Sequence, residues 1–306
     1  MYFLMRPLAF IFIIFFTCFL KSRGLFKKEL ALIILKIIMN LTLPAAVITA
    51  FASFEGRYSL LLLSAVSLVM TIVPYFVTYF LTKGKPKEQR VYYMINMTGF
   101  NMGCYGLPII QSFYGSFGAL LCALFDLGNS VMMTSGNYAF TSLLLHTDED
   151  AAPVTAGALL KRLFSSVPLY CYLTLTVLSF CGISVPQAAV DFIAPIANAN
   201  AFLSMFMLGL LFSPRPKPGY LRHTACVLAI RYAVMAAAAF LCWHILPLPL
   251  EVRRILCLLL FCPIGAFAPA FIEQCHGDGE MAAFTNSISI ILSLIIMTSL
   301  TAIFTP

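Results

Sequence analysis

Long apolar runs separated by short polar connections dominate the chain. Most runs are long enough to cross a bilayer as a helix, which takes about 20 residues. We therefore expect ten membrane-spanning helices, at about 2–20, 30–53, 59–82, 91–113, 117–145, 162–182, 190–212, 222–246, 252–274 and 280–304. The pattern predicts an all-α integral membrane protein.

One connection near the middle has the composition of a linker. The sequence HTDEDAAPVTAG covers 146–157, and it leaves five predicted spans on each side. We expect a first five-helix repeat over 1–145, a short cytoplasmic linker over 146–161 and a second five-helix repeat over 162–306. Because five is odd, two copies of such a unit insert in opposite orientations, so the predicted repeat is inverted.

The fourth span of each half is interrupted by glycine and proline. The interruptions are Gly99, Gly103, Gly106 and Pro108 in 91–113, and Pro263, Gly265 and Pro269 in 252–274. A proline inside a helix removes a hydrogen bond and clashes with the preceding turn, and hydrocarbon offers no water to the freed backbone groups. Breaks at matching positions of two inverted halves point to a transport site near the bilayer midplane.

Each predicted break leaves two half-helices, and we expect the second halves to begin near Pro108 and Pro269. A helix N-terminus carries free N–H groups and the positive end of the dipole, which suit a carboxylate. The C-terminal ends of the first halves offer carbonyls to a cation. Asn101 is expected to add a side-chain donor, with others from Asn40 or Asn129. The alternative is that both breaks are packing kinks.

Three charged residues lie well inside predicted spans, away from the span ends, where charge is costly and usually functional: Lys36, Asp126 and Arg231. Asn129 follows Asp126 by three residues, so the two share a helix face. We hypothesise that Asp126 couples transport to an ion, a proton or sodium, or orders the site through Asn129. A buried pair of Asp126 with Arg231 is left open, and Lys36 is expected to snorkel to the nearby surface.

Composition excludes a soluble protein. Hydrophobic residues make up 61% of the 306 residues and charged residues 10%, with a mean hydropathy of +0.95, whereas soluble domains carry about 25% charged residues. The ten cysteines form no CxxC pair, the four histidines are scattered, and HExxH, GxSxG and GxxxxGK[ST] are absent. We therefore expect no enzyme, no cofactor and no metal site.

The distribution of Lys and Arg predicts the orientation. Thirteen of the 19 lie in connections on one side of the predicted topology and four on the other. This bias places the linker in the cytoplasm and both termini outside. The basic residues form short clusters rather than a continuous stripe, so the expected partner is the lipid bilayer and not nucleic acid.

Four segments carry a family resemblance: NLTLPAAVITAF (40–51), NMGCYGLPIIQSFYGSFG (101–118), FMLGLLFS (206–213) and APAFIEQCHGDGEMAAF (268–284). With these segments the chain resembles the auxin efflux carrier family, specifically its short bacterial members described as malate or malonate permeases. The resemblance covers essentially all of the chain. Its most specific part is the Gly-Leu-Pro break followed by a Gly-x-x-Gly turn.

The resemblance implies a bacterial inner-membrane permease with crossed helices 4 and 9. Helices 1, 2, 6 and 7 would form a scaffold and helices 3–5 and 8–10 a moving transport domain. Its substrate would be a small organic acid, driven by a proton gradient or membrane potential, and a homodimer is left open. With the three asparagines above included, the expected substrate-binding residues are Asn101, Met102, Gly103, Tyr105, Gly106, Pro108, Ala266, Ala268, Pro269, Asn40 and Asn129.

These observations predict a secondary transporter that moves a mono- or dicarboxylate by an elevator-like alternating-access mechanism. The rival interpretation is a membrane sensor or scaffold component that transports nothing. A membrane-embedded enzyme would need a cluster of catalytic polar groups, which the sequence does not show.

Overall fold

The computed structural model describes residues 5–52, 58–147, 157, 165–213 and 217–304, and these residues form helices and connections without a strand. Seven helical stretches among them are long and apolar enough to cross a membrane: Met5–Ser22, Leu30–Phe51, Tyr58–Leu81, Met102–Leu145, Gln187–Leu211, Tyr220–Ile245 and Gly279–Phe304. The chain is thus all-helical, with the helices of a multi-pass membrane protein. The predicted linker lies almost wholly outside the described residues.

The first half of the chain contains several spans built from more than one helical piece. In order these are α1 (Met5–Ser22), α2 (Leu30–Ile37), η2 (Ile38–Thr42), α3 (Leu43–Phe51), η3 (Tyr58–Leu61), α4 (Leu62–Leu81), α5 (Lys87–Asn96), η4 (Met102–Gly106), α6 (Leu107–Val131), η5 (Met132–Gly136) and α7 (Asn137–Leu145). Within α6, Gly115 has φ +60° and ψ −149°, a conformation that needs glycine. This kink divides α6 at the connection predicted between spans 4 and 5.

The second half contains three helices of 25 or 26 residues and three shorter ones among its described residues. These are α9 (Val167–Phe180), α10 (Gln187–Leu211), α11 (Tyr220–Ile245), α12 (Leu250–Leu260), α13 (Ala268–Gln274) and α14 (Gly279–Phe304). The sixth predicted span began at 162, but α9 begins at Val167, and the described residues just before it are not helical. Pro168 explains the later start, because proline fits the first turn of a helix, where its missing N–H is not needed.

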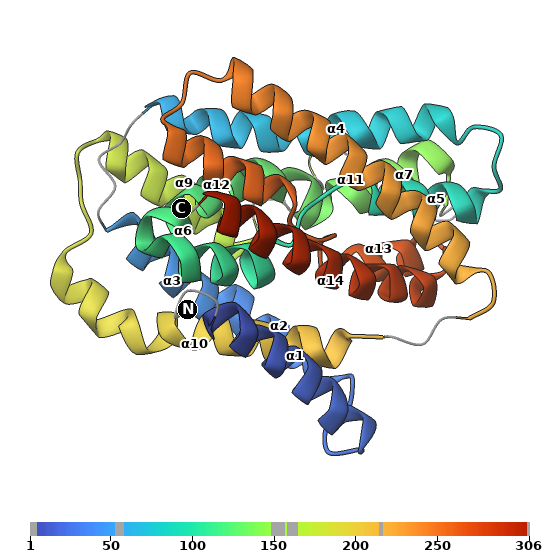
Figure 1. The fold of residues 1–306 in the computed structure, drawn as a ribbon, viewed down its shortest axis with the longest axis horizontal. Coiled ribbons are helices and arrows are strands. Elements are labelled where there is room, and N and C mark those ends of the chain that lie inside the picture. The colour runs from blue at the N-terminus through green and yellow to red at the C-terminus, as the bar shows by residue number, and fades with distance from the viewer. Residues whose placement is uncertain (1–4, 53–57, 148–156, 158–164, 214–216, 305–306) are drawn as a thin grey trace.

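The helices pack as two groups. The first group is α1, α2, α3, α9 and α10: α1 and α3 pack along α10, and α9 packs on α3. The second group is α4–α7 and α11–α14, in which α4 packs on α6, α5 on α7, and α11 on α12 and α14. In Figure 1, α1 and α10 lie along the lower side of the molecule and α4 and α11 along the upper side. The contact between α3 and α6 joins the two groups.

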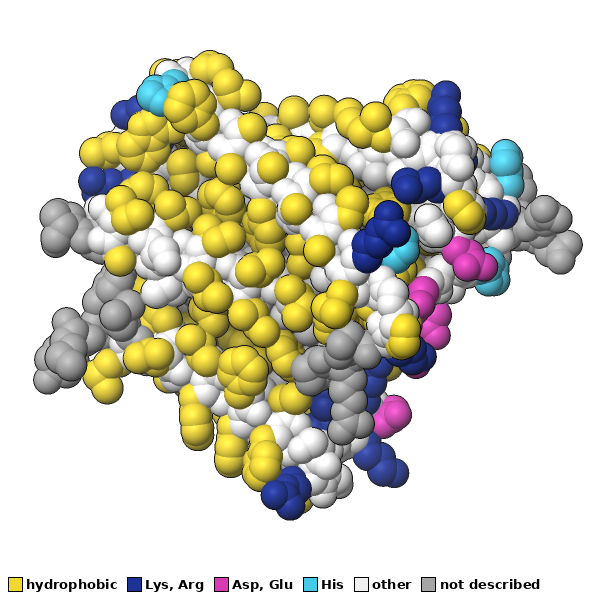
Figure 2. Space-filling model, turned by 45° about the vertical axis from the view of Figure 1, so that its right-hand side comes forward, with side chains coloured by type: hydrophobic (Ala, Val, Ile, Leu, Met, Phe, Trp, Pro, Cys, Tyr) yellow, Lys and Arg dark blue, Asp and Glu magenta, His cyan; other side chains and the backbone are white. Residues whose placement is uncertain are grey.

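The surface matches a bilayer environment. Figure 2 shows hydrophobic side chains over the middle of the face, with Lys, Arg, Asp and Glu gathered mainly at its right-hand and lower margins. Large apolar side chains such as Phe12, Phe80 and Phe192 are more than half exposed, as expected of residues in contact with lipid. In Figure 1, α1 begins and α14 ends at the same end of the molecule. Which side of the membrane this end faces stays a prediction.

Candidate functional site

The first break lies between α5 and η4. The chain leaves helical geometry after Asn96 and resumes it at Met102, and Gly99 within the gap has φ +75°. A side chain on Gly99 would be strained by this φ, and its Cβ would come within 2.1 Å of the Met133 Sδ. Glycine is therefore required where the helix is interrupted.

The prediction that the second half-helix begins near Pro108 is wrong. The helix begins at Met102 with a wide turn in which the Gly106 N–H donates to the Asn101 C=O over 2.9 Å. Pro108 lies in the first turn of α6, after this turn. Such a turn bonds residues five apart, so the helix can begin before the proline. The prediction for the second break agrees with the structure, since α13 begins at Ala268 with Pro269 in its first turn.

The two breaks touch. The Asn101 N–H, at the end of the first break, donates to the Pro263 C=O in the second over 2.9 Å. The Met133 side chain packs against both, because a Cβ on Gly265 would come within 2.0 Å of its Cε. The two interrupted segments are therefore in direct backbone contact.

Polar side chains from two neighbouring helices satisfy the backbone at the breaks. The Asn129 amide in α6 accepts from the Phe100 N–H and donates to the Phe100 C=O, both over 2.9 Å. In α14, the Ser289 hydroxyl accepts from the Ile264 N–H over 3.3 Å, and Asn286 donates to the Gly265 C=O over 3.3 Å. These bonds replace the water that a broken helix would need.

Arg231 provides the cation at the end of the first half-helix. Its guanidinium, fully buried, donates to the C=O of Asn96 over 3.2 Å and of Gly99 over 2.6 Å. It also lies over the Phe100 ring, 5.0 Å from the centroid. A positive charge at a helix C-terminus is favourable, so the carbonyls expected to hold a cation are occupied by this side chain. Arg231 therefore contacts backbone carbonyls and the Phe100 ring, whereas Asp126 bonds to Asn129 and Tyr172. The buried pair of Asp126 with Arg231 that the sequence left open is not formed.

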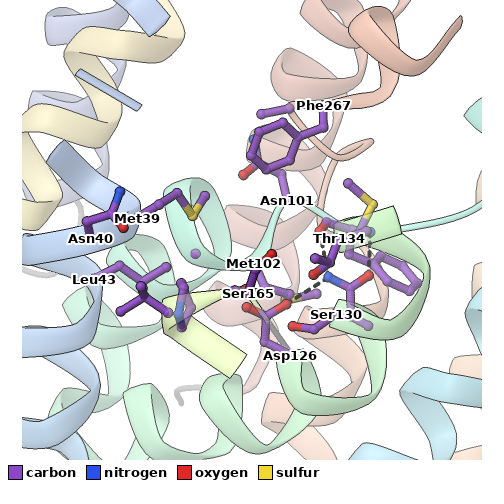
Figure 3. Close-up of a pocket in the computed structure, with 18 of the residues that line it drawn as sticks. Met39, Asn40, Leu43, Asn101, Met102, Asp126, Ser130, Thr134, Ser165 and Phe267 are labelled. Atoms are coloured by element: carbon purple, nitrogen blue, oxygen red, sulfur yellow. Dashed lines mark hydrogen bonds between the residues drawn. The ribbon is translucent and has the colours of Figure 1, made fainter. Parts of the chain in front are cut away.

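A cavity of about 350 Å³ lies beside the first break, between the two groups of helices. From the first group and the residues before α9 it is lined by Met39, Asn40, Leu43, Ser165, Ser166, Val167 and Pro168. From the second group it is lined by Phe100, Asn101, Met102, Gly103, Asp126, Asn129, Ser130, Met133, Thr134, Ala266, Phe267 and Phe271. Figure 3 shows Asn40 and Leu43 on one side of it and Asp126, Ser130 and Thr134 on another.

Asp126 has two neutral donors. Its carboxylate accepts from the Asn129 amide over 2.7 Å and from the Tyr172 hydroxyl over 2.7 Å. Tyr172 belongs to α9, so this bond connects the two groups of helices. The Asp126 side chain is 8% exposed, and each carboxylate oxygen keeps a further lone pair for another donor.

Asn101 has an unused donor at the same cavity. The residue is 4% exposed, and its side-chain Nδ2 has no hydrogen-bond partner. It directly precedes η4. The N–H groups of Gly103, Cys104 and Tyr105 lie at the start of this helix, where backbone N–H groups have no partner within the helix. A buried donor without a partner costs free energy, and an acceptor on a ligand would recover it.

The structure brings only part of the predicted site together. The cavity is lined by Asn40, Asn101, Met102, Gly103, Asp126, Asn129 and Ala266, whereas Tyr105, Gly106, Pro108 and Ala268 are buried away from it. Pro269 lines a second cavity of about 310 Å³ on the other side of Ala266 and Phe267. At Asn40, the amide donates to its own helix, at the Lys36 C=O over 2.8 Å.

Sequence reasoning missed several lining residues. Tyr172 is the most consequential, because it completes the environment of Asp126 from a helix 46 residues away. Its position, five residues after the start of α9, carries no pattern that separates it from other membrane tyrosines. Met133 and Phe267 were missed because apolar residues near a break look like ordinary packing.

A scan against protein-family models found no match, and a search of curated proteins found none either.

Proposed function

We propose that this protein is a secondary transporter for a small organic anion, a mono- or dicarboxylate, of the auxin efflux carrier type. It would have ten spans in two inverted five-helix repeats and move its substrate by an elevator-like alternating-access mechanism. The proposal places it in a bacterial inner membrane with both termini outside. A homodimer is compatible with it but is not needed for the site.

One observation carries the proposal. The unpartnered Asn101 Nδ2 belongs to a residue that, with the first turn of η4, lines a small cavity beside two breaks in contact with each other. Amide donors and a helix N-terminus together favour a carboxylate, and broken spans at a cavity are the usual arrangement of a transporter site. The N-terminus of α13 contributes less, because its Ala268 N–H already donates to the Gly265 C=O over 3.0 Å.

Two further observations support the repeat. The seven long apolar stretches leave out the segment 252–274, which is broken into α12 and α13, and the shorter apolar α9; the kink at Gly115 divides Met102–Leu145 into two. Counting these pieces as spans gives the ten that the apolar runs predict. The bond from the Phe100 N–H to Asn129 has a counterpart in the bond from the Ile264 N–H to Ser289, as two related halves would require.

The packing supports an elevator mechanism. The first group of helices corresponds to the proposed scaffold, the second to the proposed transport domain, and both crossed breaks belong to the second. The cavity lies where the groups meet. Movement of one group past the other would carry a bound anion across the membrane, with the Asp126 carboxylate as the acceptor for a positive charge that moves with it.

Counterflow in proteoliposomes tests the proposal. Vesicles that contain the purified protein would be loaded with unlabelled acids from a panel of mono- and dicarboxylates that includes α-amino acids, and uptake of each labelled acid would be measured. We expect exchange of at least one acid, with loss of exchange in Asn101→Ala. A folded wild-type protein that exchanges none of them would refute the transporter and favour a membrane sensor.

A further inference from the structure

Among the described residues, the Asp126 carboxylate has no basic partner. Among the described residues that line the cavity it is the one with a charged side chain, and both of its hydrogen-bond donors, Asn129 and Tyr172, are neutral. The Arg231 guanidinium lies behind the Phe100 ring and donates to backbone carbonyls. A buried carboxylate is costly without a positive charge or a proton nearby, so a cationic group in the cavity would be favourable.

The carboxylate lies close to the proposed anion site. One side-chain amide, that of Asn129, contacts the Asp126 carboxylate and both backbone groups of Phe100. Asn101, with its unused donor, is the next residue along the chain. Asp126 and Asn101 both line the cavity, so it contains a donor for an anion and an acceptor for a cation.

We propose that Asp126 binds the ammonium group of a zwitterionic substrate whose carboxylate binds at Asn101, so that the substrate is an α-amino acid. This inference rests on the proposed function: it keeps the carboxylate site and changes the substrate from a net anion to a zwitterion that carries a carboxylate. An α-amino acid carries both charged groups on one carbon, and the chain links the two subsites through the Asn129 amide, which bonds both Asp126 and the Phe100 backbone next to Asn101. A simple carboxylate would add a negative charge beside Asp126, and a dicarboxylate would add two, in a site of low dielectric.

The rest of the cavity agrees with a small, largely apolar amino acid. Leu43, Met102, Phe267 and Phe271 present hydrocarbon, ring and thioether surface to it. Its volume of about 350 Å³ is at the small end of ligand pockets. A single amino acid with an aliphatic or aromatic side chain fits these limits.

Matched pairs of ligands test the proposal. Binding to the purified protein would be measured by thermal shift and calorimetry for alanine, leucine and phenylalanine, and for their counterparts without the amino group: propionate, 4-methylpentanoate and 3-phenylpropionate. Glutarate would serve as the dicarboxylate. We expect at least one amino acid to bind about tenfold or more tightly than its deaminated counterpart, because charge-assisted hydrogen bonds are the stronger ones.

Two variants separate the roles. Asp126→Asn should remove the preference for the amino group, whereas Tyr172→Phe, which keeps the carboxylate and removes one neutral donor, should keep or increase it. If the Asp126→Asn protein does not fold, Tyr172→Phe and the wild-type ligand pairs still decide. Each measurement would be repeated at two pH values and with and without sodium.

The outcomes are distinct. Tighter binding of deaminated acids or glutarate to wild type, with Asn101→Ala weakening it, overturns the amino-acid proposal and leaves the anion transporter standing. Dependence of that binding on sodium or on low pH, lost in Asp126→Asn, identifies the cation as sodium or a proton and equally overturns the ammonium subsite. Absence of binding by every probe contradicts both proposals.

Discussion

Asn101 is the residue on which the anion site depends. In Asn101→Ala we expect carboxylate affinity to fall about tenfold or more, because a hydrogen bond to a charged group contributes about 1.5–3 kcal/mol. Stability should change by no more than about 1 kcal/mol, since the lost side-chain Nδ2 has no partner in the protein. Ligand-dependent thermal shift measures both quantities in one experiment.

A matched control is Asn200→Ala. Asn200 is also buried, but its Oδ1 accepts from the Thr42 hydroxyl over 3.0 Å within the first group of helices. This variant should lose stability and keep ligand affinity, the reverse of Asn101→Ala. Equal affinity in wild type and Asn101→Ala would place the site elsewhere.

For individual residues, the sequence showed which polar side chains lie at membrane depth, but it did not show which residues they contact. Asn101, Asp126 and Asn129 stood out because polar residues are rare in long apolar runs, and all three line one cavity. Tyr172 did not stand out, since its role depends on how α9 packs near α6. Asp126 and Arg231 were correctly seen as unusual, yet their partners are fixed by tertiary packing.

At the element scale, the two breaks differ in why they need glycine. Gly99 has φ +75° and Gly265 has no positive φ, although a Cβ on either would collide with Met133. Gly265→Ala should cost about 1–3 kcal/mol through overpacking. Gly99→Ala should cost about 2–5 kcal/mol, because an L-residue also strains in that conformation. Thermal unfolding midpoints in a fixed detergent give the ranking.

Met133→Ala distinguishes overpacking from backbone strain. In the Met133→Ala protein, adding Gly265→Ala should cost much less stability than it costs in wild type, because the colliding thioether is gone. Adding Gly99→Ala to the Met133→Ala protein should remove only the part of its cost that is due to the collision, so the cost of backbone strain should remain. Equal rescue of both glycine variants would show that backbone conformation at Gly99 is not limiting.

The position of each break was only partly predictable from sequence. Pro269 marked the start of α13 correctly, because a proline in the first turn often coincides with a helix start. Pro108 did not mark the start of its half-helix, since a wide turn at Met102–Gly106 precedes it. Proline shows where a helix hydrogen bond is missing, and only at the first break does a glycine at positive φ, Gly99, accompany it.

For the whole molecule, the hydrophobic pattern was sufficient to predict the all-α class, and it came close to the boundaries of the long helices. Runs of about 20 apolar residues predicted α1, α4, α10, α11 and α14 closely, because bilayer thickness fixes the length of a span. The pattern gave no information on which helices pack together, since both groups present the same apolar surface. The division into scaffold and transport domain came from the resemblance, and the packing into two groups is compatible with it.

Relative movement of the two groups can be tested with a reversible crosslink. An ideal Cβ on Gly103, in the second group, would lie 3.6 Å from the Leu43 Cγ in the first, which is near disulfide range. In a protein whose native cysteines are replaced, Leu43→Cys with Gly103→Cys should form a disulfide under oxidation and stop transport, and reduction should restore it.

The matched control is Thr42→Cys with Asn200→Cys, whose side chains meet within the first group, so its crosslink should leave the transport rate nearly unchanged. The single variants, oxidised in parallel, account for any direct effect of a thiol beside the cavity. An oxidised Leu43–Gly103 pair that still transports at the rate of its reduced form would show that the groups do not move past each other, and the elevator mechanism would have to be abandoned.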